Sequence, residues 1–262
     1  MKKFTKLTAF ALALVMALGL LAGCGSSNSD NSTPSGDDAS DTAKTKLVVA
    51  TSPDFPPFES LEGGEVVGIE VDILNKIAEK MGMELDIQQM DFDSVIPGVQ
   101  AGKFDVGMSG ITVTDKRKEN VDFSSVYFMA AQAIVVADGS SITGKADLEG
   151  KKVSVQTGTT AEEYCMGNGY EVLAFTANND AAAALTSGKV DAWVVDNEVA
   201  LAMAPELGLT VLDEAMTSEP YAFAFQKGSE LVAPFNEALD ALLADGTVEK
   251  IFQQYGVTYI AP

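Results

Sequence analysis

The sequence predicts an α/β fold made of two similar lobes. From Lys46 onward, strand-like and helix-like patterns alternate, which is typical of an open parallel sheet covered by helices. A short pattern in the first half, Gly102 to Val106, recurs in the second half as Gly188 to Ala192. In both places a helical pattern ends at glycine and a strand pattern begins at once, so the repeat indicates two copies of one α/β unit.

The elements of the first copy follow in order. Residues 47–50 form a short apolar run that predicts a strand, and residues 70–81 place apolar side chains at helical spacing. Residues 84–88 alternate in polarity, which predicts a second strand. A helix is expected to begin near Ser94 and a third strand near Asp105, which completes a β-α-β-α-β order.

The second copy is expected to repeat part of this order. Residues 152–156 resemble residues 46–50, and both segments predict strands. Further on, we expect a strand over residues 221–225, a helix with one apolar face over residues 231–243, and a last helix from Thr247.

The repeat also pairs two segments that lie where parallel strands should end. Ser109 and Gly110 in the first copy correspond to Val195 and Asp196 in the second. Ligands of open α/β sheets bind beyond the carboxyl ends of the strands. We therefore expect both lobes to present their binding edges to one shared cleft.

The composition excludes several classes of function. The 262 residues include 38 Asp and Glu, 17 Lys and Arg and no His, for a formal net charge of −21. Without histidine there is no Ser-His-Asp triad, Cys-His pair or His-ligated zinc. So much negative charge argues against nucleic acid and anionic membrane surfaces as partners. We predict no catalytic residue, no metal and no cofactor.

The first 23 residues predict a secretory signal peptide. Lysines precede an apolar run over residues 7–22, which is shorter than the roughly 20 residues that span a bilayer. The run closes with Leu-Ala-Gly before Cys24 and resembles a bacterial lipobox, which implies cleavage before Cys24 and its lipidation; an incidental cysteine after an ordinary signal peptide is the alternative. Residues 24–45 are polar and predict a flexible tether. Cys165 is then left without a partner, and we expect it to be packed in the interior.

Arg117 is the single arginine of the chain and follows Thr114, which is a suitable helix N-cap. A cation near a helix N-terminus opposes the helix dipole, so helix stability does not explain this arginine. A guanidinium binds a carboxylate through two parallel hydrogen bonds, which lysine cannot do. The alternative is a solvated charge in a basic surface patch.

At this point several segments resemble the polar amino-acid-binding proteins of bacterial ABC importers, in order over nearly all of residues 46–256. They are Asp54–Glu59, Val67–Asp72, Ser109–Arg117, Val121–Ser124, Gly150–Val153 and Gly158–Thr160. The resemblance implies an α/β two-lobed clamshell, like the type II periplasmic-binding proteins, with two crossover strands at the hinge. Lobe 1 would comprise residues 46–131 and 221–262, and lobe 2 would comprise residues 132–220.

The resemblance also implies roles for individual residues. Arg117 would bind the ligand α-carboxylate, together with the backbone N–H of Thr160 at a helix start. Asp196 would bind the α-ammonium, although it could instead be a helix N-cap. The Thr112 hydroxyl and a backbone carbonyl of Ser109 or Gly110 would share that ammonium.

At the other positions, the role that the resemblance implies is less specific. Phe55 and Phe92 would enclose the ligand side chain, or could be ordinary core residues. Thr159 begins a capping box with Glu162 and could therefore be purely structural. Trp193 lies in the middle of a predicted strand, where we expect it to be core.

One position departs from the family pattern in a way that bears on which ligand is bound. Many relatives carry an aspartate where this chain has Ser52, and in several binders of basic amino acids that acid helps to hold the cationic side chain. Its absence weakens the case for arginine, lysine or histidine, unless Asp54 or Asp93 takes its place.

The function that the resemblance implies is that of an extracytoplasmic substrate-binding protein of an amino-acid ABC transporter. It would capture a polar or basic L-amino acid by hinge closure and deliver it to the membrane permease. The driving ATPase would be another chain, because this sequence has no Walker A motif. We expect a monomer that is not an enzyme, lipid-anchored to the outside of the cell membrane of a Gram-positive-like cell or in the periplasm. Two alternatives remain: a cyclohexadienyl dehydratase-like enzyme with an acid at Asp54, Asp93 or Asp196, and a ligand sensor for a membrane kinase.

Overall fold

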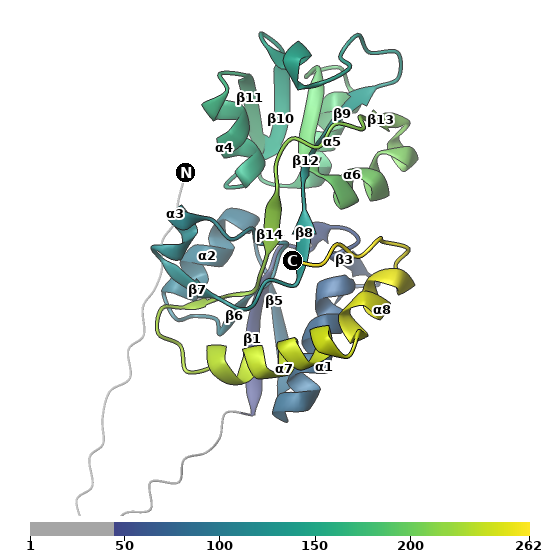
Figure 1. Ribbon diagram of the computed structural model, residues 1–262. Helices are drawn as coiled ribbons and strands as arrows, with labels where there is room; N and C mark the ends of the chain where they lie inside the picture. The colour runs from purple at the N-terminus through teal and green to yellow at the C-terminus, as the bar shows by residue number, and fades with distance from the viewer. Residues whose placement is uncertain (1–44) are drawn as a thin grey trace, which may run out of the picture. The chain divides into compact units, whose positions relative to one another are not determined.

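The computed structural model describes residues 45–262, and this part of the chain forms two α/β lobes (Figure 1). Lobe 1 is built on a five-stranded sheet with strand order β5-β1-β6-β15-β7, and lobe 2 on a five-stranded sheet with strand order β11-β10-β12-β9-β13. The predicted α/β fold with two lobes is confirmed.

Lobe 1 combines its main sheet with helices and a small antiparallel sheet. The strands of the main sheet are β1 (Lys46–Thr51), β5 (Glu84–Gln89), β6 (Val106–Gly107), β7 (Val121–Phe123) and β15 (Ala224–Gln226). The helices are α1 (Ile69–Met81), α2 (Phe92–Gln100), α3 (Asp115–Lys118), α7 (Val232–Ala244) and α8 (Thr247–Gln254). The small sheet contains β2 (Asp54–Phe55), β3 (Glu59–Glu62) and β4 (Glu65–Val67).

Lobe 2 has the same kind of architecture. Its strands are β9 (Gln132–Ala137), β10 (Lys152–Gln156), β11 (Glu171–Phe175), β12 (Ala192–Asp196) and β13 (Leu209–Val211). Its helices are α4 (Thr160–Gly167), α5 (Asn178–Thr186) and α6 (Asn197–Met203), with 3-10 turns at η1 (Lys145–Leu148) and η2 (Pro205–Leu207).

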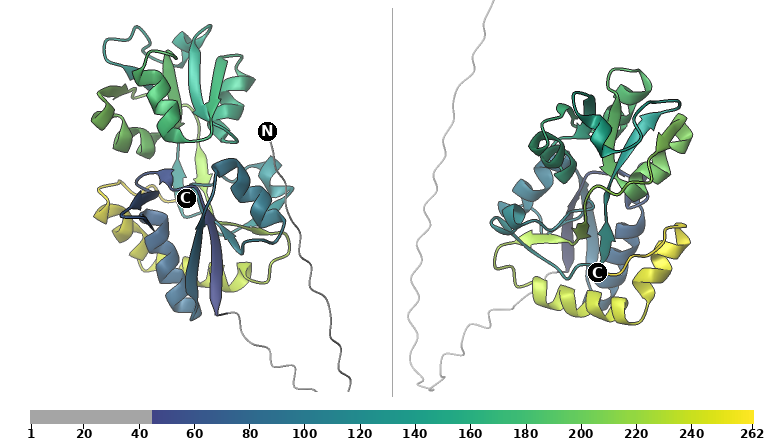
Figure 2. Two further views of the ribbon diagram at one scale, coloured as in Figure 1. Left: turned by 180° about the vertical axis from the view of Figure 1, so that it is seen from behind. Right: turned by 45° about the horizontal axis from the view of Figure 1, so that its top comes forward.

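Two short antiparallel strands connect the lobes. They are β8 (Phe128–Ala130) and β14 (Glu219–Tyr221), which pair from Glu219 opposite Ala130 to Tyr221 opposite Phe128. Figures 1 and 2 show them side by side between the lobes. Aromatic rings anchor them to lobe 1, since the Phe128 ring stacks on Phe252 with centroids 4.6 Å apart and Tyr221 packs edge-on to Phe58 at 5.2 Å.

The internal repeat corresponds to equivalent strands in the two sheets. In lobe 1, β1 pairs in parallel with β6 and places Val49 opposite Val106. In lobe 2, β10 pairs in parallel with β12 and places Val153 opposite Ala192. The carboxyl ends of the paired strands carry the segments that were expected to face a shared cleft.

The structure corrects three details of the prediction. Helix α2 begins at Phe92 rather than near Ser94, because Asp91 takes the N-cap position. The strand expected over residues 221–225 is divided into β14 and β15, because the N–H of Ala222 donates to the carbonyl of Ile111 and that of Phe223 to the hydroxyl of Ser124. Both main sheets are mixed rather than wholly parallel, since β15 and β9 run antiparallel to their neighbours.

The interior of each lobe is apolar. Trp193 is fully buried in β12, in agreement with the expectation that it is core. Cys165 is also fully buried, on α4, and burial raises the pKa of its thiol to about 12. At neutral pH this thiol is therefore protonated and unreactive.

No helix within residues 45–262 is long and apolar enough to cross a membrane. The predicted signal peptide (residues 1–23), the predicted lipidation at Cys24 and residues 25–44 of the predicted tether lie outside the described residues.

Candidate ligand-binding site

A small cavity lies between the lobes, where the carboxyl ends of the central strands meet. Among the described residues, its lining comprises Phe55, Phe92, Ser109, Gly110, Thr112, Arg117, Gln156, Thr159, Thr160 and Asp196. All nine side chains and loop residues predicted as ligand-binding are in this set, so residues far apart in sequence converge on one cavity. Gln156 is the member that sequence reasoning missed.

Arg117 is held in place on the lobe 1 side of the cavity. Its backbone N–H donates to the Thr114 hydroxyl at 3.1 Å, which confirms Thr114 as the N-cap of α3. The guanidinium donates to the carbonyl of Thr112 at 2.9 Å and, across the cleft, to the carbonyl of Gly158 at 3.1 Å. Its carbon lies 5.6 Å from the centroid of the Phe92 ring, within the range of a cation–π interaction. These contacts orient the guanidinium and leave further N–H groups to a ligand.

The start of α4 borders the cavity on the lobe 2 side. The Thr159 hydroxyl accepts from the N–H of Glu162 at 3.2 Å, which confirms it as the helix N-cap. The Glu162 carboxylate in turn accepts from the N–H of Gly158 at 2.7 Å, one residue earlier than in the usual capping box. The Thr160 hydroxyl accepts from the Gln132 side-chain amide at 3.3 Å. A helix N-terminus at this place favours an anion such as a carboxylate.

Asp196 supplies a buried carboxylate at the end of β12. It occupies the N-cap position of α6, but its side chain makes no capping bond, and Oδ1 has no hydrogen-bond partner among the described residues. The residue is only 7% exposed, and this burial raises its pKa to about 7, an effect that the nearby Glu219 reinforces. Because a buried carboxylate oxygen without a hydrogen-bond partner is unfavourable, this position is suited to a cationic group of a ligand.

A buried acidic pair supports the loop of Ser109 and Gly110. The Ser109 hydroxyl donates to Glu59 at 3.0 Å, and the Gly110 N–H donates to Glu70 at 2.9 Å. The Tyr127 hydroxyl also donates to Glu70. Burial, and after it the neighbouring Glu70, raise the pKa of Glu59 well above its usual value. The two acids therefore hold the loop in place through these hydrogen bonds.

Gly110 is required at its position, which leads to a first prediction. Its φ is +54°, and a Cβ would stand 2.5 Å from Cε1 of the Phe55 ring. We expect Gly110→Ala to push this ring into the cavity and to weaken ligand binding at least tenfold, as measured by calorimetric titration. The matched control is Gly139→Ala, where φ is +75° and a Cβ would meet no atom within 4 Å. Both substitutions strain the backbone by about 1 kcal/mol, so equal affinities in the two variants would contradict the prediction.

Gln156 is oriented by contacts on both ends of its amide. The nitrogen donates to the carbonyl of Thr176 at 3.1 Å and lies 3.4 Å from each carboxylate oxygen of Asp54. The oxygen accepts from the Asn178 side chain at 2.9 Å. In sequence, the available signal was its place at the carboxyl end of β10, equivalent to that of Asp196 on β12.

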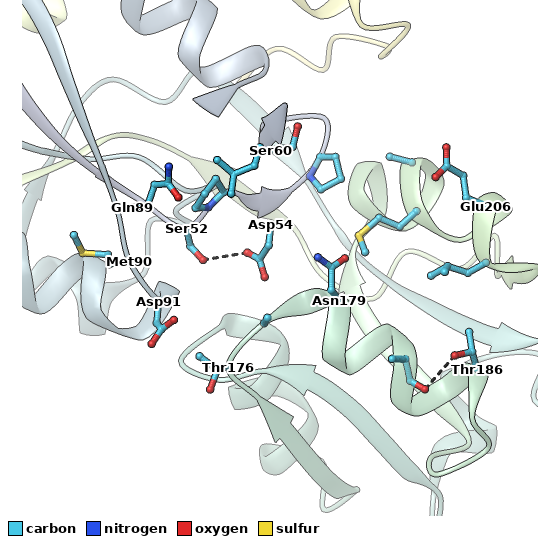
Figure 3. Close-up of a pocket in the computed structure, with 18 residues that line it drawn as sticks. Ser52, Asp54, Ser60, Gln89, Met90, Asp91, Thr176, Asn179, Thr186 and Glu206 are labelled. Carbon is cyan, nitrogen blue, oxygen red and sulfur yellow. Dashed lines mark hydrogen bonds between the residues drawn. The ribbon is translucent and has the colours of Figure 1, made fainter. Parts of the chain in front are cut away.

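The two acids considered as substitutes at the position of Ser52 do not line this cavity. Asp54 lies at a larger opening between the lobes, drawn in Figure 3, where its carboxylate accepts from the Ser52 hydroxyl at 3.0 Å. Asp93 lies against Gly158, whose added Cβ would be 3.1 Å from the Asp93 Cβ.

Proteins with similar sequences are named as amino-acid-binding proteins. The chain is 35% identical over 243 residues to the arginine-binding extracellular protein ArtP of Bacillus subtilis, covering 90% of this chain and 92% of that protein. It is 34% identical over 264 residues to the ABC transporter glutamine-binding protein GlnH of the same organism, covering 95% and 97%.

Solved structures with a similar sequence and fold are likewise named as amino-acid-binding proteins. An ancestral arginine-binding protein bound to arginine is 42% identical, with a TM-score of 0.76, and the match covers 81% of this chain and 98% of that one. The ancestral amino acid-binding protein AncCDT-1, a precursor of cyclohexadienyl dehydratase, is 35% identical with a TM-score of 0.76, covering 80% and 95%. Residues 47–258 match the sequence pattern of a single family, and the chain belongs to that family, the bacterial extracellular solute-binding proteins, family 3.

Proposed function

We propose that this protein is the extracytoplasmic substrate-binding protein of an amino-acid ABC importer, which takes up a polar or basic L-amino acid. The observation that carries the proposal is the pairing of an oriented cation, Arg117, with the buried carboxylate of Asp196, whose Oδ1 has no hydrogen-bond partner within residues 45–262, in one small cavity. An α-amino acid carries a carboxylate and an ammonium on one carbon, which is the complementary charge pattern.

Each wall of the cavity has a role in this proposal. Arg117 and the N–H of Thr160 bind the α-carboxylate, with Thr159 holding the helix terminus in place. Asp196 binds the α-ammonium together with the Thr112 hydroxyl and a carbonyl of Ser109 or Gly110. The rings of Phe55 and Phe92 enclose the ligand side chain.

Closure of the lobes follows from the distribution of these residues. Arg117 belongs to lobe 1, whereas Thr160 and Asp196 belong to lobe 2. The full set of contacts therefore exists only when the lobes are closed, and the ligand stabilises the closed form because it binds that form better. We assign residues 46–131 and 221–262 to lobe 1 and residues 132–220 to lobe 2. The closed protein then docks on a membrane permease whose ATPase is a separate chain.

The test of this function is calorimetric titration of the purified protein with each of the common L-amino acids. We expect at least one polar or basic L-amino acid to bind much tighter than millimolar, and its D-enantiomer to bind far more weakly. The relatives named for arginine, histidine and glutamine make those three the first ligands to titrate. If none of the series binds tighter than millimolar, the proposal is wrong.

One observation favours a second candidate, an enzyme on the same scaffold. Asp196 has a pKa of about 7, which suits a general acid, and AncCDT-1 is named as a precursor of a dehydratase. We infer that this protein is a binder rather than an enzyme, because the relatives with high coverage are named as binding proteins and Asp196 is better used on the ligand ammonium. Incubation with prephenate or arogenate is expected to yield no aromatic product.

We also propose that the protein is anchored by a lipid on Cys24 after removal of residues 1–23. Mass spectrometry of the protein from the membrane fraction should find an N-terminal Cys24 with attached acyl chains. Cys24→Ala should release the protein from the membrane fraction without changing its ligand affinity. A wild-type protein that is recovered without lipid, starting at another residue, would contradict this proposal.

A further inference from the structure

Helix α5 of lobe 2 begins without a capping side chain of its own. Its N-cap residue is Ala177, whose φ of −112° and ψ of 145° are the extended values expected at that position. Alanine offers no acceptor to the free N–H groups of the first turn. The helix therefore has the backbone geometry of a capped terminus, but its own lobe lacks the capping group.

A side chain of lobe 1 supplies that group across the cleft. Oδ2 of Asp54 accepts from the backbone N–H of Asn178, the first residue of α5, at 2.7 Å. Figure 3 shows the Asp54 carboxylate directed toward the start of this helix, where Asn179 is labelled, with Ser52 bonded to its other oxygen. The negative charge also lies at the positive end of the helix dipole. We name this contact the interlobe cap.

The interlobe cap differs from the other contacts between the lobes. The ion pair of Lys116 with Glu163 joins side chains that are 75% and 51% exposed, and such pairs contribute little. The bond from Arg117 to the carbonyl of Gly158 belongs to the ligand site itself. The Asp54 carboxylate, in contrast, is partly buried, bonds to a backbone group and does not line the ligand cavity.

Gln156 connects the cap with the ligand cavity. It lines the cavity, its amide nitrogen lies 3.4 Å from both oxygens of Asp54, and its amide oxygen accepts from the Asn178 side chain. A residue that touches the ligand space therefore also touches both partners of the interlobe cap. The ligand and the cap consequently favour the same closed arrangement.

We propose that Asp54 is a positioning residue that stabilises the closed form by capping α5, irrespective of the side chain that the ligand carries. This inference rests on the proposed capture of an amino acid by closure. Asp54 was considered above as a substitute for the side-chain-binding aspartate that relatives carry at the position of Ser52. The present inference gives Asp54 a different role, because its carboxylate is already bonded to lobe 2. In the open form, Asp54 and the N–H of Asn178 would both be solvated, so the cap contributes to closure alone.

The test compares variants of the full chain by calorimetric titration with L-arginine and L-glutamine as probes. Asp54→Ala removes the acceptor and is expected to weaken both ligands by the same factor, about tenfold, the effect of losing a helix N-cap of about 1.4 kcal/mol. Asp54→Asn keeps one acceptor and should lose roughly threefold. The control Asp91→Asn removes the same charge at an exposed N-cap that makes no side-chain bond, and should change nothing. A loss confined to L-arginine would show that Asp54 contacts the ligand side chain, and it would overturn the proposal, as would no loss at all.

A measurement without ligand separates this proposal from the proposed function. Small-angle X-ray scattering of the ligand-free proteins should give a larger radius of gyration for Asp54→Ala than for wild type and Asp91→Asn. If no amino acid binds the wild type, the proposed function fails, while the scattering comparison still decides on the cap. A ligand-free Asp54→Ala protein that is no more open than wild type overturns the interlobe cap as a determinant of closure.

Discussion

Replacing Arg117 with alanine is expected to weaken amino-acid binding at least a hundredfold. Truncating one partner of a buried, hydrogen-bonded charge pair costs about 2–5 kcal/mol, which corresponds to roughly thirtyfold to several thousandfold in affinity. The upper part of this range applies here, because the guanidinium is already oriented by the carbonyls of Thr112 and Gly158 and by the Phe92 ring. The ligand therefore loses a preorganised group rather than a mobile one.

Two further variants define what Arg117 contributes. Arg117→Lys keeps the charge but cannot form two parallel hydrogen bonds with one carboxylate, so we expect an intermediate loss of at least tenfold. Lys118→Ala removes a neighbouring cation on α3 that pairs with Asp115 at the surface, and it should leave the affinity unchanged. Calorimetry gives the affinities, and circular dichroism checks that each variant is folded. Binding by Arg117→Ala within threefold of wild type would remove the carboxylate role from this residue.

Much of the fold could be predicted because local pattern and packing agree. Helix α1 ends at Met81, as the apolar spacing over residues 70–81 indicated, and Gly82 follows with a φ of 68°. The repeat located β6 and β12 because a helix end, a glycine and a strand start occur together in both lobes. The division of residues 221–225 could not be predicted, since it depends on bonds from Ala222 and Phe223 to distant residues.

In the candidate site, too, some residues could be predicted from sequence, whereas contacts between segments far apart in the chain could not. Arg117 and Asp196 could be proposed because the family resemblance implies a carboxylate-binding arginine and an ammonium-binding aspartate at these positions. Gln156 had only its place at the carboxyl end of β10 as a signal, and its contact with Asn178 becomes visible only when β10 and α5 are placed together. The interlobe cap is even harder to predict from sequence, because Asp54 and Asn178 lie in different lobes and Ala177 gives no sign of a missing partner.

Replacing Asp196 with asparagine is expected to separate ligand binding from stability. The asparagine cannot carry the charge that pairs with the ligand ammonium, so affinity at pH 8 should fall at least thirtyfold. The ligand-free protein should become more stable at the same pH, because the substitution removes a buried carboxylate whose Oδ1 has no partner in the described part of the chain. The ligand affinity measured by calorimetry should therefore fall, while the melting temperature of the ligand-free protein should rise. Glu198→Gln, which removes a charge two residues away and outside the cavity, should change the affinity little.

Ligand affinity should also depend on pH through the carboxyl group of Asp196. Burial raises the pKa of Asp196 from its ordinary 3.8 to about 7, so the folded, ligand-free protein holds this proton more tightly than the unfolded chain does. The stability that this contributes is fully present below about pH 4 and is lost as the pH rises through about 7. An ammonium favours the ionised carboxylate, and binding must therefore release a proton below pH 7. We expect the affinity to be constant above about pH 7 and to fall toward tenfold per unit below it, with a binding enthalpy that varies with the ionisation enthalpy of the buffer. In Asp196→Asn this dependence should disappear; a variant that retains the wild-type pH profile would exclude Asp196 as the group that binds the ammonium.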